Sequence, residues 1–258
     1  MLALVGLGLG PRDISVKALE FLKSADAIML ESYTSIIDNE SIQFVATQTK
    51  KTLIGTKRGD FEENLKATVA GAKKKRIAIL VTGDPLIATT HHIILDECSK
   101  QGVDALVFHA PSIFSSLIGE SGLDIYKFGP TTTIPYWSEH YKPVSFIHSI
   151  RKNLDNKQHT IVLFDINQAQ GRPMAIGEAY EILKAAIAQT QQNVLMKASV
   201  LVMADMGRNT QKIFYVKLGS IGALSERLHG AVISMIFPSE LNFAEEESLK
   251  RIASPSST

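Results

Sequence analysis

Cysteine, net charge and long apolar runs are scarce in this chain, and each shortage excludes a class of protein. The single cysteine, Cys98, cannot form a disulfide within the chain, and the lack of a disulfide framework fits a reducing cytoplasm. The 27 basic and 26 acidic residues leave a formal net charge of +1, which gives no reason to expect direct contact with a nucleic acid. No apolar run approaches the roughly 18 residues that cross a membrane. We therefore expect a cytoplasmic protein without a membrane or nucleic-acid partner.

Sequence patterns for metal sites and activated nucleophiles are also missing. The neighbours His91 and His92 would diverge by about 100° on a helix, so they cannot bind one ion together. The remaining histidines show neither an HxxxH nor a Cys/His spacing. The GxSxG motif of hydrolases and the GxxxxGK[ST] motif of phosphate-binding loops do not occur. We expect no metal ion, and the sequence identifies no catalytic residue.

The chain does contain strand-length apolar runs that alternate with amphipathic helical stretches. This alternation predicts an α/β fold, and 258 residues suit two domains of about 100–150 residues each. In the first domain, residues 1–111, we expect a mostly parallel sheet with flanking helices. In the second, residues 112–258, paired strand runs with fewer crossover helices predict a mixed sheet. Strands are expected at 2–6, 27–30, 52–55, 77–82, 105–109, 132–134, 160–164, 200–204, 213–216 and 231–237, and helices at 15–24, 62–75, 94–102, 145–153, 175–189 and 243–252.

A glycine-rich loop, Gly6-Leu7-Gly8-Leu9-Gly10-Pro11, follows the first expected strand. Glycines let the backbone turn sharply and approach a ligand where a Cβ would clash. The spacing is close to the GxGxxG fingerprint of dinucleotide-binding proteins, but the third glycine comes one residue early. Glu31, at the end of the second strand, could supply the carboxylate that such sites use. The loop therefore leaves open a nicotinamide-dependent dehydrogenase, a nucleotide-binding module and a turn without a ligand.

Two further loops follow two other expected strands of the first domain. The segment 82–86 reads TGDPL, and its Asp84 can accept a hydrogen bond from a ribose hydroxyl or an amino group, although Asp-Pro is also a common turn pair. The segment 110–113 reads APSI. Ligands of open α/β sheets bind beyond the carboxyl ends of the strands. If the sheet is parallel, the three loops form one rim.

Taken together, these segments resemble the diphthine synthases of the tetrapyrrole methylase superfamily. GDPLIATTH followed by APSI and YKFG is the specific combination, and the resemblance covers the first two thirds of the chain nearly without gaps. The segments that carry it are GLGLGPRDISVKALEFLKSAD at 6–26, ESYTS at 31–35, GDPLIATTH at 83–91, HAPSIFSS at 109–116, GLDIYKFG at 122–129 and HTIVLFDI at 159–166.

The resemblance implies a homodimer that binds S-adenosyl-L-methionine (SAM) between its two domains and releases S-adenosyl-L-homocysteine. It also implies a substrate, the 3-amino-3-carboxypropyl group on one histidine of translation elongation factor 2, which is N-methylated in diphthamide biosynthesis. The short chain and the APSI spelling resemble archaeal members, which add three methyl groups. A methyltransferase of the same superfamily that acts on tetrapyrroles or ribosomal RNA is the alternative; the near-neutral charge argues against RNA.

Carried over residue by residue, the resemblance places SAM contacts in both domains. In the first domain they fall on Leu9, Asp84, Ile87, Ser112 and Ile113. In the second they fall on Phe164 and on the turn that ends at Met206. The last family contact is a histidine; the register counted back from Pro238 puts Ile233 there, whereas His229 lies four residues earlier. We favour Ile233, because backbone groups can recognise adenine whatever the side chain.

The implied reaction moves a positive charge from sulfur to nitrogen, so it gains most from alignment and exclusion of water. The amine must be neutral to attack, and the carboxylate of the substrate needs a cationic partner. Arg12, Lys127 and Arg172 are the candidates. We expect the loops at 136–141 and 167–172 to control the access of the protein substrate.

Overall fold

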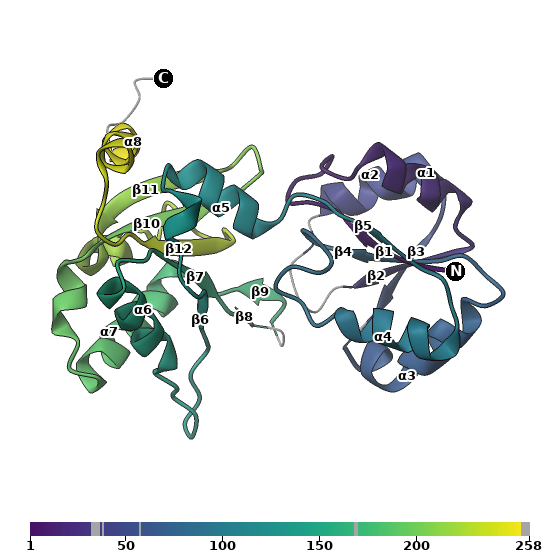
Figure 1. The fold of residues 1–258 in the computed structure, drawn as a ribbon, viewed down its shortest axis with the longest axis horizontal. Helices are drawn as coiled ribbons and strands as arrows, with labels where there is room; N and C mark the ends of the chain where they lie inside the picture. Colours follow the sequence, from purple (N-terminus) through teal and green to yellow (C-terminus); the bar gives the residue numbers. More distant parts are fainter. Residues whose placement is uncertain (32–36, 38, 57, 168–169, 254–258) are drawn as a thin grey trace. The chain divides into compact units, whose positions relative to one another are not determined.

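The chain forms two compact units in the computed structural model, which describes residues 1–31, 37, 39–56, 58–167 and 170–253 (Figure 1). The first unit is Met1–Phe114 and the second is Ser115–Thr258, so the division falls three residues after the expected boundary at 111. Most of the ESYTS segment, residues 32–35, lies outside the described residues, and so do residues 168–169 of the expected access loop. In the described part of the chain, no helix has the length and apolar character needed to cross a membrane.

The first unit is built on a five-stranded parallel sheet in the order β3-β2-β4-β1-β5 within the described residues. Its strands are β1 (Leu2–Gly6), β2 (Ala27–Glu31), β3 (Leu53–Thr56), β4 (Ile77–Val81) and β5 (Ala105–Phe108). Every residue of β1 and β4 is buried, because helices cover both faces of the sheet. The predicted parallel sheet is confirmed, and the opening apolar run is an interior strand, between β4 and β5.

Four helices flank this sheet in the described residues, with α1 and α2 on one face and α3 and α4 on the other (Figure 1). They are α1 (Val16–Ser24), α2 (Asn39–Thr49), α3 (Arg58–Gly71) and α4 (His92–Gln101). Ser15 begins α1 as its N-cap by accepting a hydrogen bond from the Ala18 backbone N–H at 3.2 Å. Burial on α4 raises the pKa of the Cys98 thiol, which keeps it unreactive.

Two helices of the first unit differ from the sequence prediction. Helix α2 was not predicted, because its buried stripe is Ser41, Val45 and Thr49, of which one residue alone is apolar. Helix α3 covers Arg58–Gly71 and not 62–75. The ammonium of Met1 donates hydrogen bonds to the carbonyls of Ala72 and Lys75, so the segment after α3 turns toward the first strand.

The second unit contains a mixed sheet in the order β11-β10-β12-β7-β6. Its strands are β6 (Thr132–Ile134), β7 (Thr160–Phe164), β10 (Ser199–Ala204), β11 (Lys212–Lys217) and β12 (Ile233–Phe237), and β8 (Ile166–Asn167) pairs with β9 (Arg172–Pro173) in a separate ribbon. Strands β6 and β7 are parallel, and the other pairs are antiparallel. The predicted mixed sheet is confirmed.

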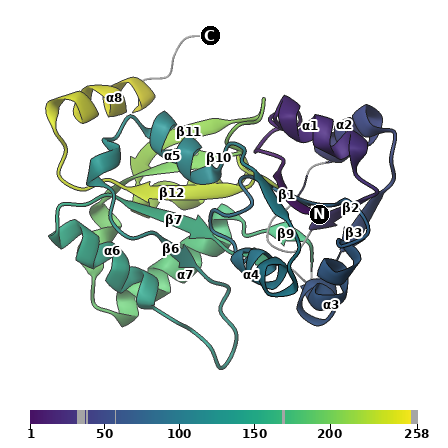
Figure 2. The ribbon, with the colours of Figure 1, turned by 45° about the vertical axis from the view of Figure 1, so that its right-hand side comes forward.

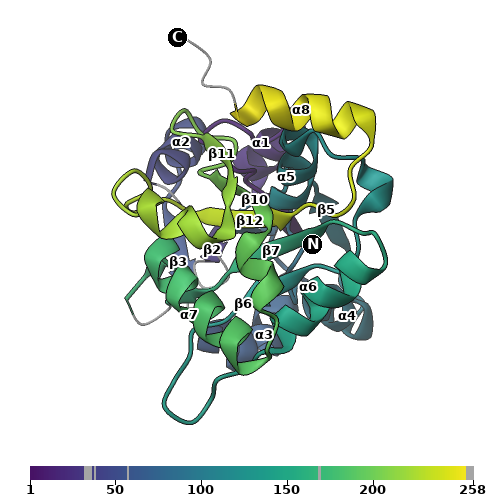
Figure 3. The same ribbon diagram turned by 90° about the vertical axis from the view of Figure 1, so that its left-hand side faces the viewer.

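Helices cover the second sheet on both sides (Figures 2 and 3). These are α5 (Ile113–Ser121), α6 (Ser145–Asp155), α7 (Ile176–Gln189) and α8 (Phe243–Ala253), with 3-10 turns at η1 (Ile125–Lys127), η2 (Asn193–Lys197) and η3 (Leu218–Leu224). Helices α6 and α7 place Phe146, Ile150 and Leu183 in the main apolar core of the unit. Helix α8 lies on the opposite side of the sheet, beside β11.

A buried carboxylate fastens α8 to the second unit. Glu245 is 2% exposed. Its Oε1 accepts hydrogen bonds from the Asp124 N–H and from His159 Nε2, both at 2.9 Å. Its Oε2 accepts from Lys127 Nζ at 2.6 Å and from the Asn242 N–H at 2.8 Å. Burial alone would raise the pKa of Glu245, but the bonds from Lys127 and the backbone outweigh it and lower the pKa to about 2.

His159 completes this anchor as a neutral side chain. Its Nδ1 accepts a hydrogen bond from the Ser239 N–H at 2.9 Å, so the ring proton lies on Nε2 and is donated to Glu245. Burial lowers the pKa of His159, which keeps the ring neutral.

We predict that Glu245→Gln lowers the free energy of unfolding by about 3 kcal/mol at neutral pH, because one partner of a buried pair is lost. The folded-state pKa of Glu245 lies below its unfolded value. Its contribution is therefore complete above the unfolded pKa and is lost as the pH falls through about 2. Urea unfolding should show the stabilities of wild type and variant converging in acid.

The matched control is Glu247→Gln on the same helix, because the Glu247–Lys250 pair is exposed. This change should cost a few tenths of a kcal/mol at most. Equal effects of the two substitutions would show that Glu245 does not anchor α8.

Candidate functional site

Three loops meet at the carboxyl edge of the first sheet. Strand β1 lies between β4 and β5 and is parallel to both, so the loops that follow the three strands leave the sheet side by side. The first two are joined directly: the Gly8 N–H donates to the Gly83 carbonyl at 3.2 Å, and the Gly83 N–H donates to the Gly8 carbonyl at 2.8 Å. The single rim expected from the sequence therefore exists in this unit.

Glycine is required at two positions of the first loop. A Cβ on Gly6 would lie 2.6 Å from the Gly83 carbonyl oxygen and 2.8 Å from the Ala110 Cβ, so Gly6 lets all three loops pack together. Gly8 has a φ of +76°, and a Cβ there would lie 2.1 Å from the Asp13 Cβ. The same Asp13 accepts hydrogen bonds on Oδ2 from the Leu9 N–H at 3.0 Å and the Gly10 N–H at 2.8 Å, which holds the loop in its turn.

Asp84 joins the second loop to the third. Its side chain is buried, and Oδ1 accepts a hydrogen bond from the Leu86 N–H at 3.0 Å. Its Oδ2 accepts from His109 Nδ1 at 2.7 Å and from the Ala110 N–H at 3.3 Å. The His109 side chain remains 68% exposed. Asp84 is thus both a structural tie and the partner of an open imidazole.

The five SAM contacts expected in the first unit all lie in these loops or directly after them. Asp84 and Ser112 are buried, Leu9 and Ile113 are half-buried, and Ile87 is 45% exposed. Ile113 is the first residue of α5. These loops therefore present apolar side chains at the surface near a buried carboxylate.

The three contacts expected in the second unit gather at one end of its sheet. Ala204, the last residue of β10, pairs with Ile233, the first residue of β12. Met206 lies two residues after Ala204 and is buried. Phe164 ends β7, and its neighbour Leu163 pairs with β12 one residue after Ile233. The exposed His229 lies outside this strand, in the turn before β12.

Two of the three cations considered for the substrate carboxylate already have carboxylate partners in the second unit. Lys127 Nζ lies 2.6 Å from Glu245 Oε2. Arg172 donates to both oxygens of Glu178, each at 2.7 Å. Hydrogen bonds from Arg172 chiefly lower the pKa of Glu178, to about 2, and burial followed by the bond to Glu178 raises the pKa of Tyr136 to about 12. Tyr136, Arg172 and Glu178 are hydrogen-bonded to one another and so connect the loops around residues 136 and 172.

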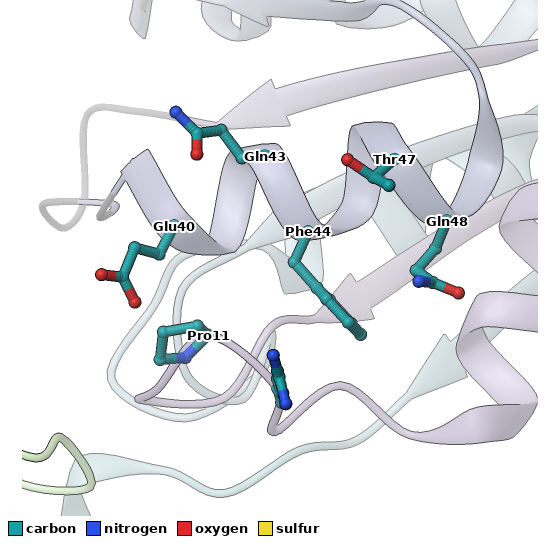
Figure 4. Close-up of a pocket in the computed structure, with 7 residues that line it drawn as sticks. Pro11, Glu40, Gln43, Phe44, Thr47 and Gln48 are labelled. Atoms are coloured by element: carbon teal, nitrogen blue, oxygen red, sulfur yellow. The ribbon is translucent and has the colours of Figure 1, made fainter.

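Arg12 is placed differently, beside a surface hollow of about 410 Å³ in the first unit (Figure 4). Its guanidinium carbon lies 5.9 Å from the centre of the Phe44 ring. The hollow is lined by the loop residues Pro11 and Arg12 and by one face of α2, namely Glu40, Gln43, Phe44, Thr47 and Gln48. Within the described residues, Arg12 has no ion-pair partner. Sequence reasoning missed this hollow because it missed α2.

His109 was also missed as a functional candidate. The sequence places it directly before APSI, but its partner Asp84 lies 25 residues earlier, and no local spacing reveals the pair. Glu31, which could have served a nicotinamide ribose, is 1% exposed and lies 3.6 Å from the buried His91. Glu31 is therefore buried and not accessible to a nicotinamide ribose, and this burial argues against a dehydrogenase.

Known proteins match the chain over nearly its whole length. A family model described as Tetrapyrrole (Corrin/Porphyrin) Methylases matches residues 1–222. A diphthine synthase from Methanococcus aeolicus is 36% identical over 253 residues, which is 97% of each chain. One from Methanocaldococcus jannaschii is 33% identical over 256 residues, covering 97% of this chain and 98% of that one. A crystal structure of diphthine synthase has a TM-score of 0.87 at 31% identity, covering 98% of this chain and 95% of that one.

The fold and the rim of loops therefore define a methyltransferase of the tetrapyrrole methylase class. Within that class, the chain belongs to the diphthine synthase family, because identity above 30% extends over nearly its full length. The family predicted from the sequence is confirmed, and the dehydrogenase alternative is excluded.

We predict that Asp84→Ala weakens the binding of S-adenosyl-L-homocysteine about 10- to 100-fold, since a buried charged hydrogen-bond acceptor typically contributes about 1.5–3 kcal/mol. Lys74→Ala, on an exposed turn, should change the affinity less than about twofold. Calorimetric titration measures both. Equal affinities for the two variants would mean that Asp84 only shapes a turn.

Proposed function

We propose that this protein transfers methyl groups from SAM to the amine of the 3-amino-3-carboxypropyl-histidine of translation elongation factor 2, in diphthamide biosynthesis. Three transfers would give the trimethylated product. The observation that carries the proposal is the match to diphthine synthases over 97% of both chains, which includes all three rim loops. The proposed homodimer follows from the family resemblance, and the proposed cytoplasmic location follows from the single cysteine, which leaves the chain without a disulfide framework.

In this proposal, the rim loops of the first unit would hold the cofactor. Leu9 and Ile87 offer apolar surface, and Asp84 and Ser112 offer polar groups. The resemblance assigns the remaining cofactor contacts, Phe164, Met206 and Ile233, to the gathered ends of β7, β10 and β12 in the second unit. When bound, SAM supplies an activated methyl group on a sulfonium. Ties such as Gly8–Gly83 and Asp84–Ala110 support the proposal because they hold the loops in place before the ligand arrives, and alignment is what this transfer needs.

The substrate carboxylate is assigned to Arg12 in this proposal. Its guanidinium can form two parallel hydrogen bonds to a carboxylate. Its position beside the first loop puts it on the unit that carries Asp84, whereas Lys127 and Arg172 are each held by a glutamate. The loops at 136–141 and 167–172 remain the proposed access surface for elongation factor 2.

The direct test incubates the protein with labelled SAM and elongation factor 2 that bears the aminocarboxypropyl-histidine. We expect label in the modified factor, with three methyl groups on the amine by mass spectrometry, and none in the factor with an unmodified histidine. Label in ribosomal RNA or a tetrapyrrole instead of the protein would refute the assignment.

We further predict that Arg12→Gln raises the KM for the modified factor about 10- to 100-fold, the equivalent of one lost charge-assisted hydrogen-bond pair. Arg12→Lys should recover part of the loss, since it keeps the charge but not the planar fork. The affinity for S-adenosyl-L-homocysteine serves as the control and should not change. A KM for Arg12→Gln within twofold of the wild-type value would remove Arg12 from substrate recognition.

A further inference from the structure

The pair formed by His109 and Asp84 has the arrangement of an oriented base. Nδ1 of His109 lies 2.7 Å from Asp84 Oδ2. A carboxylate accepts hydrogen bonds, so the proton of the neutral ring lies on Nδ1, and Nε2 carries the free lone pair. The carboxylate is held in turn by the backbone N–H groups of Leu86 and Ala110. The ring is therefore oriented by a group that is itself fixed.

Exposure separates His109 from the buried histidines of the chain. His91 is 1% exposed and His159 is fully buried, and both are bound inside their units. The side chain of His109 is 68% exposed. A purely structural role would need only the Nδ1 side of the ring, and the Ala110 N–H already ties the third loop to Asp84. The open Nε2 has no structural task that this geometry explains.

The position of His109 matches a need of the proposed reaction. It comes directly before the Ala110–Ile113 segment, which carries two of the expected cofactor contacts, Ser112 and Ile113. An alkyl amine is largely protonated at neutral pH, and its nitrogen cannot attack until that proton leaves. Each transfer to this amine therefore releases one proton, and a positioned base typically accelerates such a step by about 10²–10⁴-fold.

We propose that His109, oriented by Asp84, is the base that accepts this proton; the inference rests on the proposed function. The N–H bond of the substrate ammonium breaks and its proton binds to Nε2. The electron pair left on nitrogen forms the new N–C bond, and the pair of the broken C–S bond stays on sulfur as a neutral thioether. The imidazolium then returns the proton to solvent, to which its ring is open. No oxidant or further reactant is required.

The test compares three variants with the wild-type protein on elongation factor 2 that bears the aminocarboxypropyl-histidine. His109→Gln keeps an N–H donor for Asp84 but cannot accept a proton. It therefore distinguishes the role of His109 as a base from its role in holding the loop through Asp84. His109→Ala removes both and leaves room for free imidazole. His148→Ala, at an exposed position on α6, is the control histidine. Calorimetry with S-adenosyl-L-homocysteine reports the binding site independently of activity.

We expect His109→Gln and His109→Ala to bind S-adenosyl-L-homocysteine within about threefold of wild type while the methylation rate falls about 100-fold or more. Added imidazole should restore part of the rate of His109→Ala and none of that of His109→Gln. The deficit of both variants should shrink as the pH rises toward the range where the amine loses its proton unaided. His148→Ala should behave as wild type.

A wild-type methylation rate in His109→Gln would overturn the proposal. Equal losses of S-adenosyl-L-homocysteine affinity and methylation rate, with no recovery of the His109→Ala rate on adding imidazole, would also overturn it, because His109 would then serve only to connect the loops. In both cases the wild-type protein methylates its substrate and the proposed function stands. A wild-type protein inactive on the modified factor would overturn the function and this inference together.

Discussion

The hydrogen bonds of the Asp84 carboxylate hold the second and third loops of the first unit in one arrangement, and the Gly8–Gly83 backbone bonds attach the first loop to the second. The carboxylate accepts from two backbone N–H groups and from His109. Gly6 makes this possible, because a side chain there would collide with the Gly83 carbonyl and with Ala110. Charge-assisted bonds in a buried setting are among the stronger polar interactions of a protein. Contacts within the chain therefore hold the three loops of the rim together.

Aspartates also bind neighbouring loops in the second unit, at the end of its sheet where Phe164, Met206 and Ile233 gather. Asp205 follows β10, and its carboxylate accepts from the Val232 N–H at 3.0 Å and from the Thr210 hydroxyl at 2.9 Å. Asp165 follows β7 and accepts from the Tyr136 N–H at 3.1 Å. In both units an aspartate within three residues of the end of a strand accepts a hydrogen bond from the backbone of a neighbouring loop. Short acidic side chains at strand ends thus replace the ladder bonds that are lost where the sheet ends.

Apolar runs were sufficient to locate most strands, because a strand covered on both faces is apolar throughout, as β1 and β4 are. Helix α2 could not be predicted from the apolar pattern, because two of its three buried residues are polar. The hollow beside Arg12 is lined by α2, so it could not be predicted either. The pairing of Lys127 with Glu245 joins residues 118 positions apart. No periodicity or motif reports such a contact, so these candidate cations could not be ranked from the sequence.

The candidate cations differ in whether a carboxylate already binds them. In the second unit Lys127 and Arg172 are neutralised by carboxylates whose pKa values are lowered to about 2, so both pairs stay ionised over the physiological range and hold elements together. In the first unit Arg12 stacks on a ring and lacks a carboxylate partner within the described residues, and His109 keeps one nitrogen open to solvent. A charge that is already paired must break that pair before it can bind a substrate, and this cost opposes binding. Of the three cations considered for the substrate carboxylate, the one without a carboxylate partner in the described residues, Arg12, therefore lies on the unit whose loops form the rim, as does the exposed His109.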